Sequence, residues 1–198
     1  MTPEPRSALD EAVLGAIAAG DVDGATARVL DAYGRELLTF LHAIARTPAD
    51  ADDAWGVLCA AIWRSLGGFE GRSSVRTWVY VLARRSLIRV TRRQRRDDVP
   101  LSQASAVGRL AAELHRTSLP HLAPVRDRFG ELRSQLADDD QLLLILRVDR
   151  DLSWREVAEI IADDGDDLER VAATARKRFE RIKAQIRALA TAAGLVER

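Results

Sequence analysis

The sequence is poor in cysteine, in aromatic residues and in long apolar runs. Cys59 is the only cysteine among 198 residues, which excludes an intrachain disulfide and a zinc site built from several cysteines. Stretches without a charged side chain reach ten residues, as in 54–63, whereas a membrane-spanning helix needs roughly 20 apolar residues. The first residues also lack the basic-then-apolar order of a secretory signal. We therefore expect a soluble, cytoplasmic protein without membrane insertion.

Neither sign of charge dominates the whole chain, but charge is segregated along it. The 30 Lys and Arg residues balance 30 Asp and Glu residues. Residues 61–96 nonetheless carry ten arginines and one acidic residue, and residues 169–198 carry eight basic and three acidic residues. Acidic blocks, at 1–60 and 138–168, precede the two basic blocks. A basic block attracts phosphates, whereas an acidic block disfavours nucleic acid or faces a basic partner.

Apolar periodicity predicts an all-α fold, and no segment has the pattern of a strand. Aromatic residues make up only 5% of the chain, and the dominant Ala, Leu and Arg favour helix. Apolar residues recur at helical spacing in three segments of the first half, 21–46, 50–66 and 74–90. We expect Asp50 to cap the second of these helices, and Ser73 or Ser74 to cap the third.

The proline- and serine-containing segment 97–123 predicts a linker with one short helical patch between two small helical domains, 1–96 and 124–198. Within the second domain, Ser153 and Glu156 fit a capping box at the start of a helix. Four helices are expected there, at 125–136, 138–148, 153–161 and 168–190.

Two segments have a composition suited to nucleic acid. In the first, a polar loop leads into a helix that interleaves arginines with Trp78 and Tyr80. Arginines at helical spacing bind phosphates or base edges, and aromatic rings stack on bases outside the duplex. The alternative is that the two rings belong to the core and the arginines to a solvated face. In the second segment, the short helix 153–161, a turn and a basic helix follow the helix-turn-helix plan. A surface helical hairpin is the alternative there.

In this order, the segments resemble a sigma factor of bacterial RNA polymerase, from the extracytoplasmic-function (ECF, group IV) group of the sigma-70 family. The resemblance is carried by 33–37, 48–53, 63–66, 69–80, 152–161, Arg178-Phe179 and Arg181. It implies a sigma region 2-like helical bundle at 1–96 for the −10 promoter element. It further implies a region 4-like helix-turn-helix domain at 124–198 for the −35 element.

The resemblance also implies roles for individual residues and partners. Core polymerase, through its β′ clamp and β flap, and promoter DNA are the implied partners, and an anti-sigma factor is a common one in this group. The β′ clamp would be contacted by Asp50, Asp52 and Asp53. The −10 element would be bound by Phe69, Arg72, Ser73, Ser74, Arg76, Trp78, Tyr80, Arg84 and Arg85. The −35 element would be bound by Thr174, Arg176, Lys177, Arg178 and Arg181.

Three features depart from the family pattern. Gly56-Val57 stands where the family usually has a Gln-Glu pair, the turn at 163–168 is longer than usual, and the linker at 97–123 is long for the group. The longer turn leaves the register of the −35 recognition helix open.

Other classes of protein fit the sequence less well. His42, His115 and His121 are scattered, no phosphate-binding glycine motif occurs, and no metal site or cofactor is expected. We therefore do not expect an enzyme. A helix-turn-helix regulator that acts as a dimer without core polymerase would explain 138–190, but not the 69–80 motif.

Overall fold

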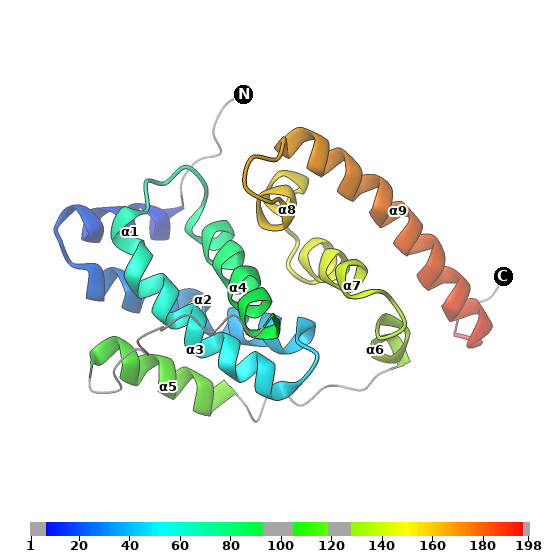
Figure 1. Cartoon of the computed structure of the whole chain (residues 1–198), viewed down its shortest axis with the longest axis horizontal. Helices are drawn as coiled ribbons and strands as arrows, with labels where there is room; N and C mark the ends of the chain where they lie inside the picture. The colour runs from blue at the N-terminus through cyan, green and yellow to red at the C-terminus, as the bar shows by residue number, and fades with distance from the viewer. Residues whose placement is uncertain (1–6, 93–104, 119–127, 196–198) are drawn as a thin grey trace. The chain divides into compact units, whose positions relative to one another are not determined.

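The computed structural model describes residues 7–92, 105–118 and 128–195, and these form helices and turns without a strand (Figure 1). The predicted all-α fold is confirmed. The chain divides into two compact units, residues 1–123 and 124–198. Within the described residues, no helix has the length and apolar composition needed to cross a membrane.

Five helices lie within the described residues of the first unit. They are α1 (Ala8–Ala18), α2 (Val22–Ile44), α3 (Pro48–Ser65), α4 (Val75–Thr91) and α5 (Ala106–Ser118), with a 3₁₀ turn at Leu66–Gly68. The core lies among α2, α3 and α4, where Leu37, Leu58 and Val79 have no exposed surface. Helix α1 packs on α2 and was not anticipated from the sequence.

The boundaries of α3 and α4 follow from their caps. Thr47 is the N-cap of α3 and accepts a hydrogen bond from the Asp50 amide at 3.1 Å, so the expectation that Asp50 caps this helix is wrong. Pro48 is the first helical residue, where the missing N–H of proline costs nothing. Ser74 caps α4 and accepts from the Thr77 amide at 3.0 Å. The loop before α4 is thereby held at its end.

Helix α5 lies within 97–123, the segment predicted as a linker with one short helical patch, and it packs on α2 and α3. The indole of Trp55 donates a buried hydrogen bond to the carbonyl of Ala111 at 3.2 Å. Leu114 lies so close to α2 that a Cβ on Gly34 would come within 2.6 Å of its Cδ1. A glycine in mid-helix is otherwise unfavourable, so this close approach explains Gly34.

The second unit consists of α6 (Arg128–Arg133), α7 (Asp138–Leu144), a π-helical turn (Ile145–Asp149), α8 (Trp154–Ile161) and α9 (Leu168–Ala192). The predicted capping box opens α8, with Ser153 and Glu156 each bonded to the other's amide. Along α9, Ala175, Phe179 and Ile182 are buried. This apolar stripe packs α9 against α7 and α8.

Candidate nucleic-acid interface

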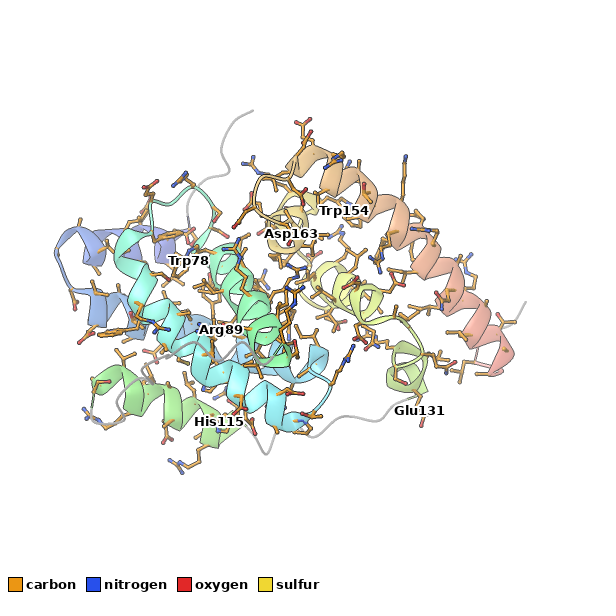
Figure 2. All side chains as sticks on the ribbon, in the orientation of Figure 1. Trp78, Arg89, His115, Glu131, Trp154 and Asp163 are labelled. Atoms are coloured by element: carbon orange, nitrogen blue, oxygen red, sulfur yellow. The ribbon has the colours of Figure 1, made fainter. Side chains whose placement is uncertain are left out.

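The loop 69–74 is anchored at both ends and exposed at its tip. Phe69 is buried and its ring centroid lies 5.2 Å from that of Trp78, which is half-buried. At the tip, the Arg72 side chain is 85% exposed and forms a 2.8 Å ion pair with Glu70. Ser73 is half-buried, and Gly71 takes a positive φ of 69° that suits glycine. The loop therefore presents a cation and a hydroxyl beside an aromatic pair. Trp78 of this pair is labelled in Figure 2.

Tyr80, which was predicted to contact DNA, is buried in this structure. Its side chain has no exposed area, and its ring packs edge-on against Phe40 at 4.8 Å between centroids. Its hydroxyl donates to Glu36 Oε1 at 2.8 Å. The residue belongs to the core, because α4 turns this position toward α2. Phe69, expected in the base-receiving loop, is also buried, and its ring packs against that of Trp78.

Arg76 is tied into the same cluster. Its guanidinium lies 2.5 Å from Glu36 Oε1 and 5.9 Å above the ring centre of Tyr80. Its side chain is 31% exposed and that of Glu36 is 24% exposed. Glu36 Oε1 therefore accepts hydrogen bonds from two side chains of α4. The Arg76 guanidinium thus helps to hold α4 against α2. The role of Glu36 was not predicted, although it lies within one of the segments that carry the family resemblance.

The charged residues around Arg76 and Glu36 also affect the pKa of Tyr33 on α2. Burial raises the pKa of Tyr33 above its usual value, and the negative charge of Asp10 raises it further, while Arg76 opposes the shift. Tyr33 is therefore neutral at physiological pH. Farther along α4, Arg84 is half-buried, and Arg85 and Arg92 are exposed. The predicted basic tail at 93–96 lies outside the described residues.

The three predicted polymerase contacts on α3 differ in their surroundings. Asp53 is exposed, whereas Asp50 is half-buried and accepts a hydrogen bond from the Thr47 hydroxyl at 2.7 Å. Asp52 Oδ1 lies 3.1 Å from His42 Nε2 on α2 and 2.8 Å from His115 Nε2 on α5. His115 is labelled in Figure 2. Two of the histidines that are scattered in the sequence therefore meet at one carboxylate. Asp52 thus links three helices.

The single cysteine of the chain, Cys59, is buried. Burial raises the pKa of the Cys59 thiol far above its usual value, so the thiol stays protonated. Among the described residues, no group of three or more His, Cys, Asp or Glu side chains is placed to hold a metal ion.

In the second unit, some of the predicted −35 residues are exposed, whereas others contact side chains of α7 and α8. Thr174, Lys177 and Arg181 are exposed and share one face of α9 at helical spacing. Arg178, also predicted to contact the −35 element, points toward α7, where its Nε lies 2.5 Å from Asp140 Oδ1. The exposed Arg176 lies 6.0 Å above the ring of Trp154 on α8.

The turn before α9 is strongly acidic. Its exposed carboxylates belong to Asp163, Asp164, Asp166 and Asp167, and Glu169 follows in the first helical turn. Asp167 is the N-cap and accepts from the amides of Glu169 and Arg170. This end of α9 is therefore already occupied by carboxylates, which repel a phosphate backbone.

Residues 29–97 match the sigma-70 region 2 family. The matched segment includes most of α2, all of α3 and α4, and the loop between them. No curated protein matches the chain. The family match supports an RNA polymerase sigma factor of the sigma-70 family, a class whose general partners are the polymerase core and promoter DNA. It leaves α1, α5 and the second unit outside the matched range.

Proposed function

We propose that the chain is an ECF-type sigma factor that directs core RNA polymerase to promoters and holds the opened −10 region. The observation that carries the proposal is the exposed loop 69–74 leading into an arginine-bearing helix, inside the segment that matches sigma-70 region 2. In this role the polymerase supplies all catalysis and the chain contributes binding energy. Its place of action is the cytoplasm.

Capture of a single strand is the step that this surface suits. Unstacking a base costs a few kcal/mol, and stacking on an aromatic ring returns about 1–3 kcal/mol per base. The side chains available for this are Arg72, Ser73, Trp78, Arg84 and Arg85, all half-buried or exposed. Because stacking on an aromatic ring is available only to an unstacked base, binding favours the opened promoter without nucleotide hydrolysis.

The acidic start of α3 is the proposed docking point for the β′ clamp of the polymerase. Asp53 is exposed and Asp50 and Asp52 are half-buried, so the three carboxylates suit a basic partner surface. The second unit would bind the −35 element through Thr174, Lys177 and Arg181, and would adjoin the β flap. An anti-sigma partner is consistent with the same class and would compete for these surfaces.

The decisive experiment is run-off transcription with core polymerase, followed by mapping of the initiation sites. We expect start-specific transcripts only when the chain and core enzyme are both present, and weak duplex binding by the chain alone. Tight sequence-specific duplex binding by a free dimer would instead support the helix-turn-helix regulator.

Charge variants separate the two proposed surfaces of the first unit. The double variant Arg84→Ala/Arg85→Ala should reduce open-complex formation by about tenfold or more while leaving core binding within about twofold. Asp53→Asn should weaken core binding instead. Equal responses of both assays to both variants would contradict these assignments. Asp53 is preferred to Asp52 because Asp52 also contacts two histidines.

A further inference from the structure

One carboxylate outside the family match reaches the start of α4. Asp10 on α1 is only 5% exposed, and its Oδ1 accepts a hydrogen bond from the Val75 amide at 2.9 Å. Val75 is the first residue of α4 and directly follows the loop 69–74. Among the described residues, Asp10 is the one buried carboxylate. A buried carboxylate is costly unless its oxygens are satisfied, so this contact is a specific feature of the fold.

The geometry shows how the carboxylate is held. Its Oδ2 accepts from the Ser7 amide at 3.1 Å, while the Ser7 hydroxyl accepts from the Asp10 amide at 3.1 Å. This capping box fixes the side chain on α1. One carboxylate therefore caps its own helix through Oδ2 and a second helix through Oδ1.

Asp10 and Ser74 share the capping of α4. The first four amides of a helix have no intrahelical acceptor. Ser74 accepts from the Thr77 amide, and Asp10 accepts from the Val75 amide. A negative charge at this end is also favoured by the helix dipole. Because Phe69 anchors the other end of the loop, only residues 70–73 remain between two fixed points.

We propose that Asp10 is a positioning residue for strand capture, which sets the loop 69–74 and the start of α4 in the geometry that receives an unpaired base. Asp10 acts through the Val75 amide and does not touch DNA. Its carboxylate also occupies a helix N-terminus that would otherwise attract a phosphate, so the backbone of the captured strand is directed to the arginines. The inference rests on the proposed function, because it assigns Asp10 a part in promoter binding.

The test compares Asp10→Ala with Ser7→Ala in the full chain. Asp10→Ala removes both bonds of the carboxylate, whereas Ser7→Ala weakens only the local capping box of α1 and leaves the bond to Val75. Each holoenzyme is titrated with a labelled single-stranded oligonucleotide that carries the non-template −10 strand of a promoter mapped by run-off transcription. Core binding is measured in parallel.

We expect Asp10→Ala to weaken strand binding about tenfold, the effect of losing a charged hydrogen bond, with core binding within about twofold. Ser7→Ala should change neither by more than about twofold. Asp10→Asn, which keeps an oxygen for Val75, should fall between the two. Equal losses in Asp10→Ala and Ser7→Ala, or a parallel loss of core binding, would reduce Asp10 to a fold-stabilising residue and overturn the proposal.

A second measurement does not depend on promoter binding. Exchange of the Val75 amide, followed by NMR in the free chain, should be slow in the wild type and in Ser7→Ala and faster in Asp10→Ala. Unchanged exchange in Asp10→Ala overturns the positioning role even if strand binding falls. Failure of the wild-type holoenzyme to bind the strand at all would count against the proposed function, and the exchange result would still decide whether Asp10 holds α4.

Discussion

The two units use their charged residues in different ways. In the first unit, arginine, glutamate and aspartate side chains connect helices that are distant in sequence, as in the pair Arg76–Glu36 and the contact from Asp10 to Val75. In the second unit, the exposed face of α9 carries Thr174, Lys177 and Arg181, and the turn before it is acidic. The first unit therefore uses several charged side chains to connect helices, whereas α9 of the second unit exposes most of its charges and pairs Arg178 with Asp140 on α7.

The difference shows that a family motif is not a list of ligand contacts. The segment 69–80 is the most family-like part of the chain, yet Phe69 and Tyr80 are buried in it and Arg76 is paired. These residues shape the surface that Arg72, Ser73 and Trp78 present. In α9, by contrast, the exposed positions follow directly from helical spacing.

Substitution of Tyr80 should cause the largest loss of stability in the first unit. Tyr80→Ala removes a fully buried ring and leaves Glu36 without one of its partners. The expected loss is about 3–5 kcal/mol in the free energy of unfolding of the first unit. Urea denaturation followed by hydrogen exchange reports each unit separately, and the second unit should be unaffected. Tyr80→Phe keeps the ring and should cost only about 0.5–1.5 kcal/mol. Equal losses in the two variants would contradict a core role for the ring.

The fold was largely predictable because apolar spacing and caps are local signals. The helices at 21–46, 50–66 and 74–90 follow from that spacing, and the capping box at Ser153 from four residues. Helix α1 and the docking of α5 were missed. Both are fixed by contacts across many positions, such as Asp10 with Val75 and Trp55 with Ala111. The local signals that exist, a capping box at Ser7 and Asp10 for α1 and the mid-helix Gly34 for α5, do not identify the partner residues of these contacts.

The sequence singled out a candidate segment but did not reveal which of its side chains are buried. Arginines and aromatic residues after a polar loop led to the prediction of a nucleic-acid site at 69–80, whereas helical spacing alone did not reveal that Tyr80 faces α2. Gly34 was the available signal for α5, since a glycine in mid-helix often marks a close approach. Nothing in the sequence predicted that His42 and His115 would meet at Asp52.

The packing of α5 on α2 and α3 tests whether the first unit extends beyond residues 29–97, the segment that matches the family. Trp55→Phe removes the buried donor to the Ala111 carbonyl and leaves that acceptor unsatisfied. We expect a loss of about 1–3 kcal/mol, measured as faster amide exchange in 106–118 while α4 keeps its protection. Trp63→Phe is a matched control, because the Trp63 indole bonds to Asp23 at the exposed surface. If amide exchange in α5 is unchanged in Trp55→Phe but faster in Trp63→Phe, the docking contact is refuted.

Neighbouring residues of α9 should sharpen the contrast in the second unit. Lys177→Ala removes an exposed cation and should reduce the salt dependence of promoter binding by about one unit of slope, with unchanged stability. Arg178→Ala removes the ion pair to Asp140 and should cost about 1 kcal/mol or less, because the pair is partly solvated. Salt titrations of holoenzyme binding and denaturation of the two variants measure these effects. The opposite pattern would return Arg178 to the DNA-contacting face.

The smallest expected effect concerns the field around Asp10. Because the pKa of Tyr33 is raised in the folded chain, the unfolded chain loses this proton first as pH rises. The stability contributed by neutral Tyr33 is complete below about pH 10 and is lost as pH rises from there through the folded pKa. Asp10→Asn removes a charge that raises the pKa of Tyr33, so the phenol should ionise at lower pH, as followed by NMR of the labelled ring. Glu11→Gln removes an exposed charge on the same helix and should leave the titration in place. An equal response to both substitutions would mean that the charge of α1 as a whole, and not the buried carboxylate of Asp10, acts on α2.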